Sequence, residues 1–165
     1  MLGLLERRLL TVNLFSAELE PGSKRDGYAS RELGLGTDLG ALGWGGTIYE
    51  LGPGERICPY HWHVAEEEWL VVLTGTPTLR EPDGEEVLRP WDVAVFTRGP
   101  GGAHEVRNDT AETATVLMLS TIARMEMCVY PDSGKISAWW EDEDGSLTGL
   151  RNRPGANIDY FDGER

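Results

Sequence analysis

Apolar residues occur in the middle of the chain as short runs that are separated by turn residues. The runs recur every 8 to 14 residues and cover 47–51, 57–63, 69–74, 78–81, 86–89, 93–97, 104–107 and 113–120. No stretch between residues 47 and 120 keeps a helical period of 3.6 residues over three turns. Short strands at this spacing are typical of an all-β sandwich or barrel. The pattern therefore predicts an all-β fold, a small antiparallel barrel or jelly roll.

Turn residues predict how some of these strands are joined. Pro82, Asp83 and Gly84 stand in turn order between two runs and predict a hairpin. The ends of the chain have a different composition. Residues 16–46 are rich in Gly, Ser and charge and predict an irregular N-terminal arm, with 11–15 as a candidate first strand. The acidic run 141–144 predicts a solvated C-terminal tail.

The length of 165 residues fits a single domain, which we expect to span 1–165 with its barrel core at about 46–136.

The 15 basic and 28 acidic side chains give a net charge of −13, which repels nucleic acid and anionic membrane surfaces. Met1–Leu5 is apolar but has no basic segment before it, so no signal peptide is predicted. Cys58 and Cys128 are too few for a disulfide framework, which favours reduced thiols and a cytoplasmic protein.

The chain has three histidines, and two of them stand two residues apart in a predicted strand. Because strand side chains alternate between faces, His61 and His63 are expected on one side and Cys58 on the other. Glu68 opens the next predicted strand, and a turn can return it to the histidine pair. Imidazole and carboxylate together suit Fe, Mn, Ni, Zn or Cu. An isolated His-x-His pair is weak evidence for a metal site, because most such residues are ordinary surface or core residues.

The spacing of these residues resembles the two sequence motifs of the cupin superfamily. The chain reads Gly54-x6-His61-x-His63-x4-Glu68-x6-Gly75 and, further on, His104-x3-Asn108. In that superfamily the corresponding side chains hold one metal ion inside a double-stranded β-helix, the cupin jelly-roll barrel. The resemblance therefore implies that fold and one divalent ion, Fe, Mn, Ni or Zn. The residues that it implies as metal ligands are His61, His63, Glu68 and His104.

The second motif departs from the superfamily pattern in three places. Trp91 stands where a glycine usually precedes the aspartate, and Thr97 replaces the usual proline. Two extra residues within 99–104 lengthen the approach to His104. These changes fall at turn positions, so they concern loop geometry and leave the ligand residues intact.

Several further segments resemble one group of small single-domain bacterial cupins, some of which are labelled sugar-phosphate isomerases. They are 59–63, 79–85, 98–104 and 130–135. This likeness implies a homodimer, and it implies a metal-dependent enzyme, an isomerase or a dioxygenase, acting on a small oxygen-rich metabolite. Glu66 is our candidate general base. The alternatives are a non-catalytic binding module that senses a small molecule or metal, and a barrel with a structural metal. The net charge disfavours a phosphorylated substrate unless Arg80 or Arg98 reverses it locally.

Overall fold

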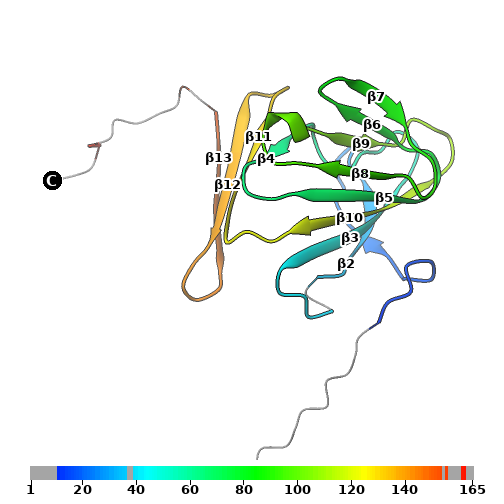
Figure 1. Cartoon of the computed structure of the whole chain (residues 1–165), viewed down its shortest axis with the longest axis horizontal. Helices are drawn as coiled ribbons and strands as arrows, with labels where there is room; N and C mark the ends of the chain where they lie inside the picture. Colours follow the sequence, from blue (N-terminus) through cyan, green and yellow to red (C-terminus); the bar gives the residue numbers. More distant parts are fainter. Residues whose placement is uncertain (1–10, 37–38, 154, 156–160, 163–165) are drawn as a thin grey trace, which may run out of the picture.

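The computed structural model describes residues 11–36, 39–153, 155 and 161–162, which form an all-β fold of antiparallel strands (Figure 1). A six-stranded sheet has the order β1 (Glu20–Pro21), β2 (Ser30–Gly34), β3 (Trp44–Leu51), β10 (Ala114–Thr121), β5 (Glu68–Thr74) and β8 (Val93–Phe96). A three-stranded sheet has the order β7 (Gly84–Val87), β6 (Thr78–Glu81) and β9 (Glu105–Arg107). A four-stranded sheet has the order β13 (Leu147–Asn152), β12 (Lys135–Glu141), β11 (Met125–Tyr130) and β4 (Trp62–His63).

The main hydrophobic core lies between the six-stranded and the three-stranded sheets. Its buried side chains are Leu51, Leu70, Val72, Leu79, Leu88, Phe96, Val106, Val116 and Met118. On β5 the inward side chains are Leu70 and Val72, so alternation places Glu68 on the same inner face. The four-stranded sheet stands across one end of the barrel (Figure 1). Glu68 therefore lies on the apolar inner face of β5, at the end of the barrel where β4 and β11 stand.

The N-terminal segment covers the outer face of the six-stranded sheet. Leu14, Ala17 and Leu19 pack against a second buried cluster that includes Ile48 and Leu117. The predicted strand at 11–15 is wrong. The Asn13 side chain accepts a hydrogen bond from the Phe15 backbone N–H at 2.9 Å, and this Asx turn bends the chain there.

The expected arm at 16–46 contains more regular structure than its composition predicts. Strand β2 pairs with β3 over five residues, and β3 begins at Trp44. Gly45 and Gly46 lie within β3, where the chain passes close to its neighbours: a Cβ at Gly45 would lie 2.9 Å from the Ser120 Oγ. Close approach, not flexibility, explains these glycines.

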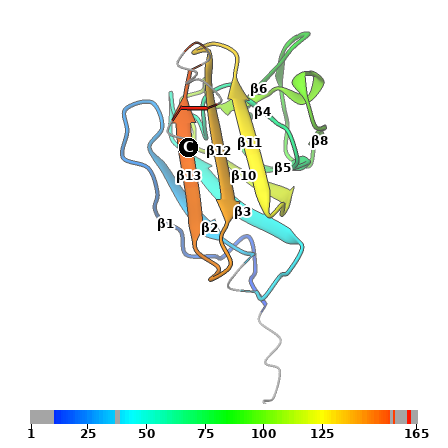
Figure 2. The same ribbon diagram turned by 90° about the vertical axis from the view of Figure 1, so that its left-hand side faces the viewer.

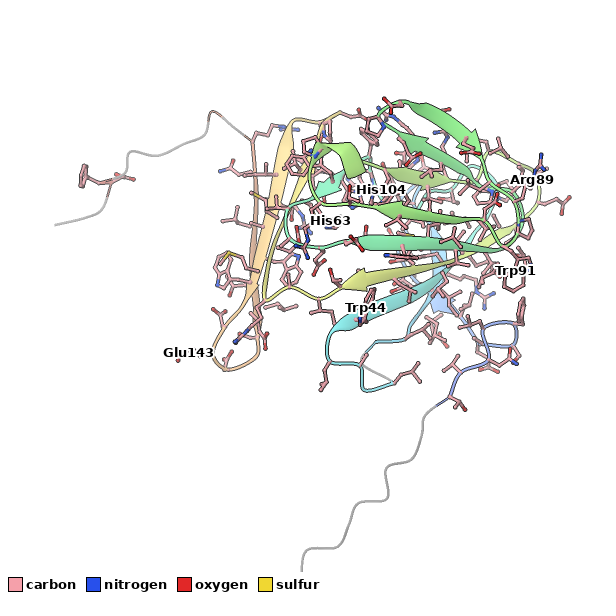
Figure 3. The ribbon with its side chains drawn as sticks, viewed as in Figure 1. Trp44, His63, Arg89, Trp91, His104 and Glu143 are labelled. Atoms are coloured by element: carbon pink, nitrogen blue, oxygen red, sulfur yellow. The ribbon has the colours of Figure 1, made fainter. Side chains whose placement is uncertain are left out.

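The expected acidic tail is also part of a sheet. Residues 141–144 lie at the end of β12 and in the turn before β13, and the two strands pair along their length (Figure 2). The Glu143 side chain is exposed at this turn (Figure 3). The run is solvated as predicted, but it marks the tip of a hairpin.

The structure describes the predicted hairpin and two of the turn positions at which the second motif departs from the superfamily pattern. The hairpin at residues 82–83 is confirmed, because Glu81 and Gly84 pair across it. Trp91 has a φ of 76°, the left-handed conformation that a glycine at this position would adopt readily. The two additional residues before His104 are accommodated by the 3-10 helix η1 (Pro100–Gly102).

Within the described residues, no helix has the length and apolar character needed to cross a membrane. The segment Met1–Leu5, for which no signal peptide was predicted, lies outside the described residues.

Candidate metal centre

The three histidines and Glu68 converge at the end of the barrel that the four-stranded sheet closes. His61 and His104 form an antiparallel bridge in which each backbone N–H donates to the other residue's carbonyl, at 3.1 and 2.9 Å. His63 follows on β4, and Glu68 is the first residue of β5. One donor atom from each of the four side chains lies within 4.8 Å of the others. Figure 3 shows His63 and His104 at this end and Trp91 at the opposite one.

The donor atoms face one another at short distances. The Nε2 atoms of His61 and His63 are 2.9 Å apart. Glu68 Oε2 lies 3.0 Å from His63 Nε2 and 3.1 Å from His104 Nε2. Ligands of one ion, each about 2.1 Å from it, stand no more than about 4.2 Å apart, so these three contacts are short enough for the donor atoms to share an ion.

Backbone carbonyls fix the tautomers of two of the histidines. His61 Nδ1 lies 2.9 Å from the Pro59 carbonyl oxygen, and His104 Nδ1 lies 3.0 Å from that of Gly102. Because a carbonyl oxygen only accepts, each Nδ1 donates and carries the proton. In the neutral imidazoles the lone pairs therefore stand on Nε2, the nitrogen that points to the common centre.

His63 has a different environment. Its Nδ1 lies 3.5 Å from Cys128 Sγ and 3.7 Å from Glu126 Oε1. Burial by itself lowers the pKa of His63, but the contacts with Cys128 and Glu68 outweigh burial and raise the pKa to about 10. Burial and the neighbouring His104 and His63 lower the pKa of His61 to about 4.

Glu126 is a buried carboxylate that the fold holds firmly. Its oxygens accept hydrogen bonds from the backbone N–H groups of Val64 at 2.9 Å, Ala65 at 3.1 Å and Met127 at 2.7 Å. These bonds tie β11 to the loop that follows β4. The carboxylate beside His63 Nδ1 is thereby fixed in place, as is common for a group that orients a metal-binding histidine.

The chemistry of the four side chains fits a divalent cation. Glu68 Oε2 and His104 Nε2 are buried and, among the described residues, have no partner in hydrogen-bonding geometry. Burial raises the pKa of Glu68, but His104 and His63 outweigh it and hold the pKa well below its usual range. The Glu68 carboxylate and the Nε2 lone pairs of His61 and His104 thus share a buried centre, where a cation would replace the Nε2 proton of His63.

A cavity of about 210 Å³ opens beside these side chains. Besides three of the ligand candidates, its walls contain Tyr49, Ile57, Cys58, Val106 and Met118. Burial raises the pKa of Tyr49 to about 12 and moves the pKa of the Cys58 thiol far upward, so both groups are protonated at neutral pH. The cavity wall can donate protons but offers no neutral-pH base other than the ligand candidates.

Aromatic rings hold two of the histidines in orientation. The rings of Phe96 and His104 stack with centroids 3.7 Å apart and planes 9° apart. Tyr130, on β11, stacks on His61 with centroids 5.6 Å apart. The sequence offered no signal for the second contact, because Tyr130 and His61 are distant along the chain.

Two sequence-based placements need comment. Cys58 was expected on the face opposite His61, but its Sγ lies 3.5 Å from His61 Nδ1. That prediction is wrong because residues 57–60 bend and are not a strand, so side chains do not alternate there. Glu66 is buried outside the four-residue cluster, and its Oε1 accepts a hydrogen bond from the Ala123 N–H at 3.0 Å. Burial raises the pKa of Glu66.

The comparisons with known proteins agree with this geometry. The family profile of the cupin domain matches residues 47–120, from β3 through β10. Residues 47–120 therefore form a match to the cupin domain, as the two motifs indicated. No curated protein sequence matches the chain.

Solved structures similar to this chain cover most of its length. A sugar phosphate isomerase from a cupin superfamily, from Silicibacter pomeroyi, has 27% identity and a TM-score of 0.74 over 92% of this chain and 98% of its own. A candidate sugar phosphate isomerase from Acidithiobacillus ferrooxidans has 24% identity and a TM-score of 0.74 over 87% and 92%. A predicted oxalate decarboxylase from Thermotoga maritima has 17% identity and a TM-score of 0.57 over 69% and 100%, a likeness of fold alone.

Proposed function

We propose that the protein is a metal-dependent enzyme that isomerises a small oxygen-rich metabolite, a sugar or sugar phosphate, in the barrel. The observation that carries the proposal is the convergence of one carboxylate and three imidazole Nε2 atoms on a buried centre beside a cavity. The similarity to the Silicibacter pomeroyi cupin that is named as a sugar phosphate isomerase supports the choice of reaction.

We assign His61, His63, Glu68 and His104 as the ligands of one divalent ion, Fe, Mn, Ni or Zn. With neutral imidazoles and one carboxylate the loaded centre has a net charge of about +1, and the ion, when bound, would act as a Lewis acid toward a hydroxy-carbonyl group. The protein residues have the other tasks. Pro59 and Gly102 hold two imidazoles in the ligating tautomer, and the apolar wall at Ile57, Val106 and Met118 limits water beside the substrate.

Glu66 remains our candidate for the group that moves the proton. Burial raises the pKa of Glu66, which strengthens its carboxylate as a base, and Glu66 would act from outside the wall of the cavity described above. Because Oε1 is hydrogen-bonded to Ala123, the second carboxylate oxygen would carry the proton. A Glu66→Gln protein that keeps its metal but loses turnover supports this role, and full turnover by the variant excludes it.

The proposal is tested first by metal analysis of the tag-free protein by inductively coupled plasma mass spectrometry. We expect one ion per chain, and loss of the ion in a His61→Ala/His104→Ala protein. The isosteric Glu68→Gln change should lower metal affinity strongly, while the adjacent Glu67→Gln leaves it unchanged, because Glu67 binds the Trp69 indole away from the centre. Absence of metal after reconstitution contradicts the ligand assignment.

The identity of the ion then separates the alternatives. Mn, Ni or Zn together with turnover of sugars or sugar phosphates supports the isomerase. Stoichiometric Fe together with oxygen uptake would identify a dioxygenase instead. Ligand binding without turnover by either the wild type or Glu66→Gln would identify a binding module. A large loss of thermal stability on chelation, with no effect of any small molecule, would identify a structural metal.

Two further features belong to this proposal. We infer a homodimer from the resemblance to small cupins and from exposed apolar side chains on one sheet, among them Trp44 and Trp69. We infer a cytoplasmic protein because Cys58 and Cys128 are both free thiols.

A further inference from the structure

A second hollow adjoins the metal cavity and has a different chemical character. It has a volume of about 580 Å³, and three chain segments, 23–28, 56–60 and 132–135, supply most of its wall. Ile57 and Cys58 line both this cleft and the metal cavity. The metal cavity alone, at about 210 Å³, is smaller than the roughly 300–1,000 Å³ usual for a metabolite site. A metabolite larger than the metal cavity would have to extend beyond it, and the cleft lies on the other side of this shared wall.

Three cationic side chains, Arg25, Arg56 and Lys135, line the cleft in a protein with a net charge of −13. The two carboxylates in its wall are neutralised by arginines. Asp132 accepts two hydrogen bonds from Arg80, at 2.6 and 2.9 Å. Glu105 lies 3.3 Å from Arg56 and 3.7 Å from Arg107.

Arg25 and Lys135 have no carboxylate partner among the described residues. The Lys135 ammonium lies 4.3 Å from the centre of the Tyr130 ring, and Tyr130 in turn stacks on His61. This contact connects the cleft to a metal ligand. The positive charge that could attract an anion thus stands beside the metal centre. The two arginines that the sequence analysis named do not supply this positive charge, because Arg80 is paired with Asp132 and Arg98 does not line the cleft.

Arg56 provides an independent sign of a missing partner. Its Nε atom is buried and has no hydrogen-bond acceptor in the part of the chain that the structure describes. A buried donor without an acceptor is costly, and because this atom is closed to solvent, an anion in the cleft would reach it only after the Arg56 side chain has moved. The hydroxyls of Tyr28 and Ser133 in the same wall are additional donors.

We propose that this basic cleft binds the phosphate group of a phosphorylated metabolite whose oxygen-rich end reaches the metal centre. The inference rests on the proposed function, because it gives the substrate of that centre a second anchor. Phosphate fits better than carboxylate. The two cations without a carboxylate partner in the described part of the chain, Arg25 and Lys135, come from separate segments and match the two charges of a phosphate dianion, whereas a carboxylate carries one charge.

The test is a calorimetric titration of the full-length, chelator-treated protein with inorganic phosphate and with acetate, at fixed ionic strength. Wild type should bind phosphate at least about tenfold more tightly than acetate, and Arg25→Gln or Lys135→Gln should each weaken phosphate binding about tenfold. The matched control is Arg89→Gln, which makes the same charge change at the opposite end of the barrel (Figure 3) and should shift the Kd by less than about twofold.

Two results overturn the inference: equal affinity for phosphate and acetate, or cleft variants that bind phosphate as the Arg89→Gln control does. Thermal unfolding and metal content, measured on the same samples, show whether each variant is folded. They also separate the two proposals. Phosphate binding by a protein that takes up no metal supports the cleft and contradicts the metal centre. Metal uptake without phosphate binding contradicts the cleft alone.

Discussion

At the scale of single residues, each imidazole of the site has a neighbouring group at its Nδ1 atom, the nitrogen that points away from the centre. Pro59 and Gly102 supply backbone carbonyls, which a side-chain substitution does not remove. His63 instead depends on side chains of β11, Glu126 and Cys128. The orientation of the His63 ring is therefore the part of the site that side-chain substitutions can change most directly.

Replacing Glu126 with alanine should destabilise the protein by about 2 kcal/mol, because the Ala65 and Met127 N–H groups lose this acceptor, while the Val64 N–H keeps the Met127 carbonyl. Metal affinity should also fall, by about 10- to 100-fold, as His63 loses an orienting partner. Urea unfolding and metal titration measure the two effects. Glu143→Ala, at the exposed tip of the β12–β13 hairpin, is the control and should change stability by less than about 0.5 kcal/mol. Equal stability of the two variants would contradict the assigned role of Glu126.

Metal uptake should release protons. With its pKa raised to about 10, His63 is protonated on both nitrogens at pH 7, and an ion needs the lone pair on Nε2. We expect about one proton released per ion at pH 7, and an affinity that rises with pH until the pKa of about 10 is passed. Calorimetry in buffers of different ionisation enthalpy counts the protons. An uptake that releases none would show that His63 is neutral before the ion binds.

At the scale of elements, the short helix η1 positions His104. A Cβ at Gly102 would lie 1.8 Å from the Thr97 carbonyl oxygen, whereas a Cβ at Gly101 meets no atom within 4 Å. Gly102→Ala should therefore displace η1, lower the melting temperature by several degrees and reduce metal content, while Gly101→Ala does neither. Thermal unfolding and metal analysis of this pair test the prediction. An unchanged Gly102→Ala protein would show that the loop adapts without moving His104.

The elements also show what could be predicted from the sequence. Strands with continuous apolar runs, such as β5 and β10, were predictable because both faces of the sheet are covered there, so successive residues are apolar. Strand β2 was missed because its sequence, Ser-Arg-Glu-Leu-Gly, carries almost no apolar pattern, and pairing with β3 holds it. Glu126 and Cys128 could not be predicted near His63, because only the pairing of β11 with β4 brings them there.

At the scale of the whole molecule, one edge of the six-stranded sheet exposes apolar side chains. On β8, Val93 and Val95 are 54% and 42% exposed, and Val95 pairs with Trp69, which is 37% exposed. An apolar edge strand of this kind is normally covered.

We expect this edge to contribute to the homodimer, so Val95→Lys should shift the protein toward a monomer of 18.3 kDa in analytical ultracentrifugation. Val87→Lys, on strand β7 of the three-stranded sheet, is the matched control and should leave the dimer intact. A monomeric wild type at micromolar concentration would contradict the dimer itself.

The bridge between His61 and His104 has a consequence for the order in which the protein matures. Its two halves are separated by the whole of β5, β6, β7 and β8, so a long loop must close before the donors meet. During synthesis the first two histidines emerge well before the third, and the chain segment between them holds only part of the ligand set. The full set of proposed ligands can therefore form only after His104 has been synthesised and the loop between the two histidines has closed.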